Sequence, residues 1–415
     1  MVAGRRQLAP LRSFGFARVF LAGLASSLGT LLAAVALAVD VKDRTNSGIW
    51  VAGVLVVEFL PTVLVGLALG PLLDRLSRRS LMIGADLCRA AVFAALPFAP
   101  NAATIVALAA VAGLATGFFR PALNAGLPNL VPEDELAHAN SLLLVTENVS
   151  WSIGPVLGGL LVAVAGPSAA YGINAASFVV SAVLLAHVPA RLLQSATALT
   201  RGYWRDLLDG WAVVRSSAPL VTVTVVWSAA MIGCAFVNVG QVFLAKNVLH
   251  AGDFGYGLLF GAAGVGLVLG NVVGASLESR VRMSFLYGGG ILLMGIGWGT
   301  AAGAPDVWVA APLCVVGGLG NGIAGVCNPL LVQRGAPDVL RGRAITVVMS
   351  VNYVVLGLAM AAAGPVIDRL GARATWGIAG GVFAATAVLA VWMAARRAQD
   401  LPAGAVATDA GGFTA

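Results

Sequence analysis

Charged side chains are scarce in this sequence: Asp, Glu, Lys and Arg make up only 10% of its 415 residues, whereas soluble domains carry about 25%. Histidine, with three residues, and cysteine, with four, are also rare, and no spacing among them is typical of a zinc site or a hydrolytic triad. The basic residues form no concentrated patch, so the net charge of +7 does not indicate nucleic-acid binding. We therefore expect no enzyme, no bound metal and no cofactor.

Apolar residues are abundant instead, at 59% of the chain. They form continuous runs, each long enough to cross a hydrocarbon core of about 30 Å. Continuous rather than alternating runs favour helices over a barrel. The sequence predicts an all-α membrane protein with twelve spans, at residues 16–39, 48–70, 80–98, 102–124, 139–165, 168–188, 219–245, 255–277, 284–303, 307–330, 341–365 and 374–395.

The distribution of Lys and Arg predicts the orientation of these spans. With the N-terminus inside, the inner segments hold eighteen basic residues and the outer loops five. We expect a multi-pass monomer of the cell membrane, in contact with the lipid bilayer, with both termini cytoplasmic. Its expected parts are two six-helix bundles at 1–188 and 219–395, a cytoplasmic linker with a short amphipathic helix at 189–218, and a disordered tail at 396–415.

A charged loop separates the second and third predicted spans, with the sequence Gly-Pro-Leu-Leu-Asp-Arg-Leu-Ser-Arg-Arg from position 70 to position 79. It resembles the signature loop of the major facilitator superfamily, and the residues that carry the resemblance are Gly70, Asp74, Arg75, Arg78 and Arg79. The stretch from Gly274 to Arg282 is similar to a second, weaker copy at an offset of 204, and Asn148 and Asn352 match at the same offset. An internal duplication explains both observations.

The fifth predicted span contains Gly154-Pro155-Val-Leu-Gly158-Gly159. Proline removes a backbone donor and lets a helix bend, and glycines let a neighbouring helix approach closely. The motif resembles the Gly-Pro-x-x-Gly-Gly signature of superfamily antiporters. The stretch Arg120–Asn140 and the segment Asn174–Phe178 are similar to the macrolide-efflux and enterobactin-exporter branch. The resemblance implies proton-coupled export of a bulky organic solute, such as an antibiotic or a siderophore, with the signature loop and this motif as conformational switches.

Ionisable residues inside a membrane are costly and therefore candidates for function. Leaving aside the first and last three residues of each predicted span, the spans contain five charged residues, namely Glu58, Asp86, Arg89, Arg120 and Glu147. We expect Asp86 and Arg89 to pair with each other or with the signature loop in a structural role. Desolvation favours the protonated form of a carboxylic acid, which makes Glu147, and after it Glu58, the predicted proton-coupling residues. A permanent ion pair between Glu147 and Arg120 is the structural alternative.

Other polar and aromatic residues of the spans could line a substrate cavity or hold helices together. The cavity candidates are Thr116, Arg120, Trp151, Asn238, Asn328, Asn352 and Tyr353. A cavity with an acid, neutral amides and aromatic rings suits a bulky amphipathic or cationic solute. An importer or uniporter on the same fold, and a membrane sensor without transport, are the alternatives to an exporter.

Asp74 is expected to act in conformational switching rather than in substrate binding. By the family resemblance, it faces the N-terminal end of the predicted span that begins near Leu340 when the outside is open. A helix N-terminus stabilises an anion by about 0.3–1 kcal/mol. We expect Asp74→Asn to slow turnover while substrate affinity stays within a few-fold, as transport and binding measurements on one purified variant would show. A large loss of affinity at normal turnover would place Asp74 in the binding site.

Overall fold

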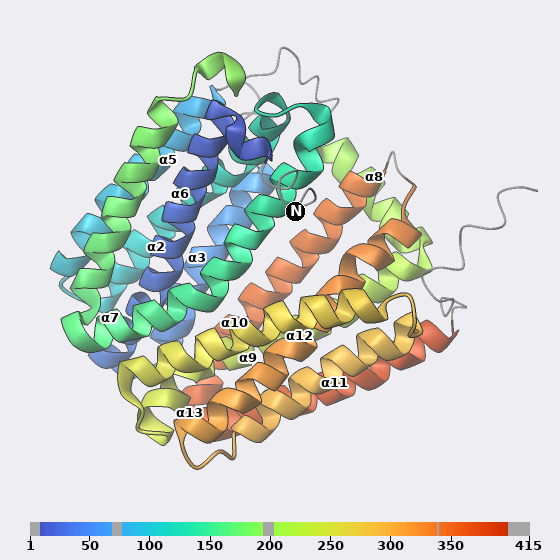
Figure 1. Ribbon diagram of the computed structural model, residues 1–415. Helices are drawn as coiled ribbons and strands as arrows, with labels where there is room; N and C mark the ends of the chain where they lie inside the picture. Colours follow the sequence, from blue (N-terminus) through green and yellow to red (C-terminus); the bar gives the residue numbers. More distant parts are fainter. Residues whose placement is uncertain (1–8, 69–76, 194–202, 338–339, 397–415) are drawn as a thin grey trace, which may run out of the picture. The chain divides into compact units, whose positions relative to one another are not determined.

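The computed structural model describes residues 9–68, 77–193, 203–337 and 340–396. Every regular element in these ranges is a helix, and none is a strand (Figure 1), which confirms the all-α prediction. Three signature residues, Gly70, Asp74 and Arg75, lie outside the described residues, as does nearly all of the predicted tail.

The long helices follow the apolar runs. They are α2 (Phe14–Thr45), α3 (Gly48–Ala68), α5 (Arg78–Ala95), α6 (Ala102–Gly126), α7 (Leu136–Ala186), α9 (Ala218–Phe243), α10 (Gly252–Leu277), α11 (Met283–Ala301), α12 (Val307–Gly335) and α13 (Arg341–Arg396). The predicted linker contains the short helix α8 (Tyr203–Ser216). Short 3₁₀ segments span Ala9–Arg12, Leu96–Phe98, Leu127–Asn129, Glu133–Glu135 and Ala190–Leu192, and a π-helical turn spans Leu244–Val248.

Eight helices in the described part of the chain are long and apolar enough to cross a membrane. Two of them, α7 with 51 residues and α13 with 56, are about twice the length that one crossing needs. Each contains one residue with a non-helical backbone, Gly166 (φ 76°, ψ 170°) in α7 and Gly371 (φ 78°, ψ 173°) in α13. Each interruption lies between two of the predicted spans.

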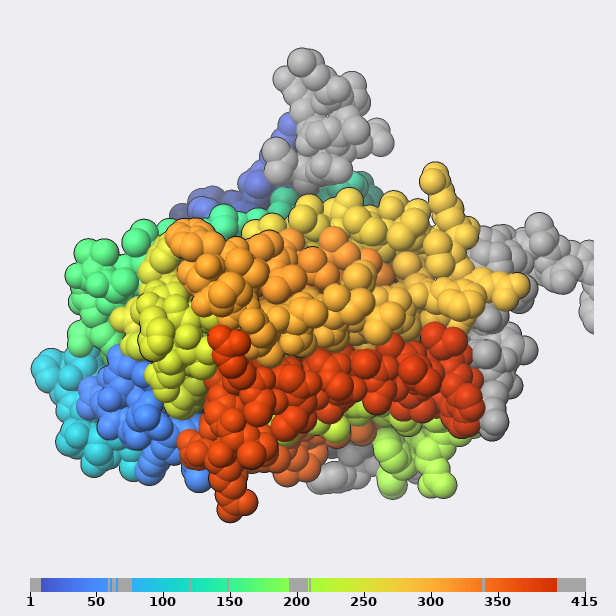
Figure 2. Space-filling view, turned by 90° about the horizontal axis from the view of Figure 1, so that it is seen from below, coloured from blue at the N-terminus to red at the C-terminus, as the bar shows by residue number. Residues whose placement is uncertain are grey.

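The chain divides into two compact units. The first comprises residues 1–203 with 251–261, and the second comprises 204–250 with 262–415. In the first unit, α7 packs along α2 and α5, while α6 packs on α3 and α5 (Figure 1). In the second unit, α13 packs along α9 and α11, and α11 also packs on α12. Figure 2 shows the yellow and orange α11 and α12 beside the red C-terminal part of α13.

The two halves of the chain repeat the same helices in the same order. The separation is 204 residues between the starts of α2 and α9, and 205 between the starts of α5 and α11 and of α6 and α12. Details within the units repeat as well: Asn101 and Asp306 cap the N-termini of α6 and α12 through hydrogen bonds from backbone N–H groups. The Phe93–Phe178 ring pair, with centroids 5.8 Å apart, matches Trp298–Phe383 at 5.4 Å.

The repeat corrects one match made from the sequence. From α5 onward the helices and their contacts correspond at 205 residues rather than 204, so the partner of Asn352 is Glu147 instead of Asn148. The change of offset arises because the start of α11 follows the start of α10 by 31 residues, whereas the start of α5 follows the start of α3 by 30. Sequence identity alone misses such a shift, because Asn148 and Asn352 are the same residue type.

We expect alanine at the two interruptions to destabilise the protein. With φ near 77° and ψ near 170°, Gly166 and Gly371 both adopt a conformation that is essentially restricted to glycine, and a residue with a Cβ atom is strained there by about 1–3 kcal/mol. Gly172→Ala and Gly377→Ala are matched controls, because these glycines have nothing within 4 Å of an added Cβ and no positive φ. Thermal unfolding of the four variants measures the difference. Equal melting temperatures for both pairs would contradict the argument.

Candidate functional site

The Gly-Pro motif lies on α7, where residues spaced four apart form rows on the helix surface. One buried row consists of Thr146, Ser150, Gly154 and Gly158. This row faces α2: a Cβ added to Gly158 would lie 2.6 Å from the Leu32 carbonyl oxygen, and one added to Gly154 would lie 2.9 Å from the Leu31 Cβ. The two glycines therefore bring α7 and α2 into backbone contact, as small residues do between membrane helices.

The neighbouring row of α7 contains four of the predicted site residues, Glu147, Trp151, Pro155 and Gly159. It faces the first turns of α10. The Trp151 ring stacks on Phe260 with centroids 5.9 Å apart, and a Cβ added to Gly159 would lie 2.7 Å from the Gly257 Cα. The half-buried Glu147 lies one turn before Trp151 on this row. An acid, an aromatic stack and the proline of the motif thus lie on one side of α7.

Glu58 on α3 interacts with the same aromatic group. Its carboxylate is close enough to Tyr256 of α10 for an electrostatic interaction, and Tyr256 packs edge-on against Phe260 at 6.3 Å between centroids. Glu58 is half-buried beside Gly113 of α6, where an added Cβ would lie 3.2 Å from the Glu58 carbonyl oxygen. Glu58 therefore interacts with a cluster of rings formed by Trp151, Tyr256 and Phe260, and Glu147 lies one turn before the first of these rings on α7.

The α10 residues of this cluster were missed by the sequence analysis. Gly257 and Gly261 are four residues apart and pack against α7: a Cβ on Gly261 would lie 2.9 Å from the Ser152 carbonyl oxygen. The sequence signal that could have indicated this contact is the pair of glycines four residues apart, with Tyr256 before the first and Phe260 between the two. It was not distinctive, because the same glycine spacing recurs elsewhere in this chain.

Two arginines of the signature loop lie in the described part of the chain, and both bind backbone carbonyls near the end of α7. Arg79 donates to the carbonyls of Leu185, at 3.3 Å, and Ala186, and Arg78 donates to Leu193 at 3.1 Å. The last carbonyls of a helix have no partner within it and carry partial negative charge, so cationic side chains stabilise them. These arginines join the start of α5 to the end of α7.

Three of the remaining cavity candidates form hydrogen bonds within their own unit. Thr116 donates to the Ala112 carbonyl of its own helix at 3.0 Å. In the second unit, Asn328 accepts a hydrogen bond from Tyr287 and Asn352 accepts one from Ser228, both at 2.8 Å. Asn238 is half-buried, and Tyr353 is 41% exposed. The side chain of Arg120 lies outside the described residues, so its predicted pairing with Glu147 stays a prediction.

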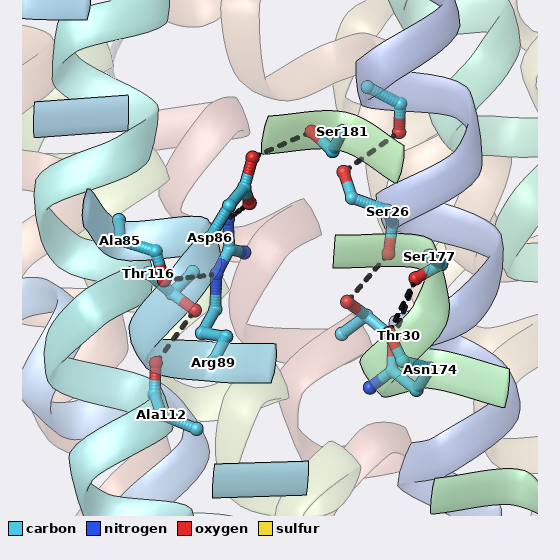
Figure 3. A network of polar contacts seen from close by, with 11 residues as sticks. Ser26, Thr30, Ala85, Asp86, Arg89, Ala112, Thr116, Asn174, Ser177 and Ser181 are labelled. Carbon is cyan, nitrogen blue, oxygen red and sulfur yellow. Dashed lines mark hydrogen bonds and ion pairs between the residues drawn. The ribbon is translucent and has the colours of Figure 1, made fainter. Parts of the chain in front are cut away.

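Asp86 and Arg89 form the predicted ion pair with each other on α5. Ser181 of α7 donates to the second Asp86 oxygen at 2.6 Å, and Figure 3 shows Thr116 beside the pair. Within the described ranges, no group of three or more His, Cys, Asp or Glu side chains is placed to hold a metal ion. The arrangement fits binding and conformational change rather than covalent chemistry.

Comparisons with known proteins agree with this reading. A family model described as "transmembrane secretion effector" matches residues 5–408. The multidrug efflux pump Tap of Mycolicibacterium fortuitum is 27% identical over 378 residues, covering 86% of this chain and 90% of Tap. The macrolide efflux protein A of Streptococcus pyogenes is 25% identical over 401 residues, covering 92% and 96%.

Solved structures show the same fold at low sequence identity. A nucleoside transporter, NupG, aligns with a TM-score of 0.76 at 13% identity and covers 91% of this chain and 99% of its own. A bacterial homologue of the iron transporter ferroportin, in an inward-facing state, aligns with a TM-score of 0.73 at 16% identity, covering 92% and 98%.

Proposed function

Because the chain belongs to the transmembrane secretion effector family of major facilitator transporters, we propose that it exports a bulky organic solute in exchange for protons. The chain is a multi-pass membrane transporter and not an enzyme. In the proposal it crosses the membrane twelve times with both termini in the cytoplasm. The interruptions at Gly166 and Gly371 then mark the turns between the fifth and sixth and between the eleventh and twelfth spans.

The observation that carries the proposal is the group of rings and acids around the start of α10. Trp151 of α7 and Phe260 of α10 form a stacked pair of rings with apolar surfaces. Two acids lie in the same unit, Glu58 on α3 and Glu147 on α7. Aromatic faces and carboxylates together bind organic cations well, because the ring quadrupole and the anion both attract positive charge. The names of the two relatives, a multidrug and a macrolide efflux protein, support the same class of solute.

Protons drive the proposed cycle through competition at a carboxylate. A protonated acid no longer attracts a cationic solute, so uptake of a proton from outside favours release of the solute there. The glycines of α7 pack closely against α2 and α10. Because these contact surfaces lack side chains, α7 can shift along both helices in the proposed cycle. The proposed parts are the bundles 1–188 and 219–395, which alternate access to the site, joined by the linker 189–218 and followed by the tail 396–415.

Expression in a bacterial host that lacks its own efflux pumps tests the proposal. We expect cells with the protein to accumulate less ethidium and less erythromycin than cells with an empty vector. A protonophore is expected to remove the difference, because it collapses the proton gradient. The control is the double variant Glu58→Gln/Glu147→Gln at equal membrane abundance. Equal accumulation in all strains, across a panel of antibiotics, dyes and siderophores, would contradict export.

A further inference from the structure

The ion pair of Asp86 and Arg89 is buried in the first unit, with Asp86 0% and Arg89 5% exposed. The charges are separated from water by α5, α6 and α7. Taking two charges out of water carries a large desolvation penalty, which their mutual attraction offsets only in part. Apolar side chains of similar size are often equally good or better for stability. A buried pair of this kind therefore needs a reason beyond packing.

The second half of the chain supplies a direct comparison. At the 205-residue offset, the counterparts of Asp86, Arg89 and Ser181 are Ile291, Met294 and Thr386. All three counterparts are buried, at 0%, 0% and 3% exposure. Thr386 donates to the Val382 carbonyl of its own helix, at 2.7 Å. The same helix contact is thus built without charge in the second unit, which shows that this fold does not require the ion pair.

Another ion pair of the first unit, Asp40–Arg44, also has apolar counterparts, Leu244 and Val248, but its contact with a backbone carbonyl recurs in the second unit. Arg44, paired with Asp40 at 2.7 Å, donates to the Ala99 carbonyl at 2.8 Å. In the second unit Arg373 donates to the corresponding carbonyl, that of Ala304, at 3.1 Å. The carbonyl is therefore bound by an arginine in both units, although Arg373 lies on α13 and not on the counterpart of α2, as expected of a contact that the fold requires. For Asp86 and Arg89 no counterpart interaction exists among the described residues.

The surroundings of the pair provide partners for either charge state of the acid. The Arg89 guanidinium lies over the rings of Phe178 and Phe119, at 4.3 Å and 4.7 Å from their centroids, and donates to the Ala85 carbonyl at 3.4 Å. These contacts hold the cation even when its carboxylate partner is neutral. The Ser181 hydroxyl donates to the carboxylate, and a hydroxyl can equally accept a hydrogen bond from a protonated acid.

We propose that Asp86 takes up and releases a proton during the transport cycle, with Arg89 as its fixed counter-charge; the role in transport rests on the proposed proton-coupled export. Protonation removes the anion of the pair, leaves the guanidinium between its two rings and weakens the link between α5 and α7. The groups that contact Asp86 are Arg89 on α5 and Ser181 on α7, and Thr116 of α6 lies beside Arg89 (Figure 3). Helix α6 also carries Arg120, whose side chain lies outside the described residues.

The test uses the triple variant Asp86→Ile/Arg89→Met/Ser181→Thr. It introduces the residues that occupy the three counterpart positions in the second half, Ile291, Met294 and Thr386. It is expected to fold with a melting temperature at or above that of the unmodified protein. Infrared difference spectra of the reconstituted protein, recorded while the pH is changed without substrate, should show the carbonyl stretch of a protonated acid that is missing in this variant. Asp86→Asn should lose the same band. A pH-dependent spectrum identical in the unmodified protein and the triple variant overturns the proposal.

Transport in proteoliposomes gives the second readout, with ethidium as the probe. The triple variant should lose accumulation driven by a pH gradient and keep downhill movement, whereas full gradient-driven accumulation overturns the role in transport. The control is Asp40→Leu/Arg44→Val, which copies Leu244 and Val248 of the second half; it should melt at a lower temperature and keep both the infrared band and coupling. If the unmodified protein shows no gradient-driven transport, proton-coupled export itself has failed, and the infrared result alone decides whether Asp86 binds a proton.

Discussion

Glu147→Gln is expected to abolish uphill export driven by a pH gradient while downhill exchange of substrate continues. Glutamine keeps the size of the side chain and its ability to bind a solute through hydrogen bonds, but it carries no proton through the cycle. Glu147 lies two turns before Gly154 on α7, on the row that faces α10. Movement of α7 against α10 would change the access of this carboxylate to water, which is what a coupling acid requires. The measurement is transport into proteoliposomes with and without an imposed gradient.

The repeat indicates that this variant folds. The counterpart of Glu147 is Asn352, a neutral amide that is 4% exposed and accepts a hydrogen bond from Ser228 at 2.8 Å. The matched control is Glu133→Gln, because Glu133 is exposed in a short 3₁₀ segment before α7 and should affect neither coupling nor stability. If Glu147→Gln still concentrates substrate against a gradient, Glu147 is not the coupling residue, and Glu58→Gln becomes the next variant.

The helices were predictable because each crossing of a membrane needs a long apolar run, and such runs dominate this sequence. Helix ends were less predictable: α2 extends to Thr45, six residues beyond the predicted end at 39. Its last turns stay helical because Arg44 pairs with Asp40 and binds the Ala99 carbonyl. A hydropathy pattern counts these two charged residues as the end of a span, although their pairing lets the helix continue.

The site was predictable in part, on α7 but not on α10. The row of Glu147, Trp151, Pro155 and Gly159 follows from the helical period, whereas its contact with Gly257 and Phe260 joins segments about 100 residues apart, which no local pattern reveals. The role that we propose for Asp86 was also not apparent from the sequence. Only the exact register of the repeat shows that the positions of Asp86 and Arg89 are apolar in the other half, and that register differs by one residue from the best sequence match.

Gly158→Leu is expected to have the largest effect on stability among the variants considered. A leucine side chain on α7 would be directed into the backbone of α2, because even a Cβ at this position lies 2.6 Å from the Leu32 carbonyl oxygen. Overpacking of this kind typically costs about 1–3 kcal/mol, and here the obstacle is backbone rather than a flexible side chain, so we expect the upper end of that range. The melting temperature and the amount of folded protein in the membrane should both fall.

Two further variants separate overpacking from a change of residue type. Gly172→Leu places the same side chain on α7 where nothing lies within 4 Å of an added Cβ, and it should be nearly neutral. Gly158→Ala should be intermediate, because the counterpart Ala363 is 0% exposed and shows that the repeat tolerates one methyl group at this position. The melting temperature is therefore expected to be highest for Gly172→Leu, lower for Gly158→Ala and lowest for Gly158→Leu. If Gly158→Leu melts together with Gly172→Leu, then α7 and α2 are not in backbone contact, and the glycines of the motif need another explanation.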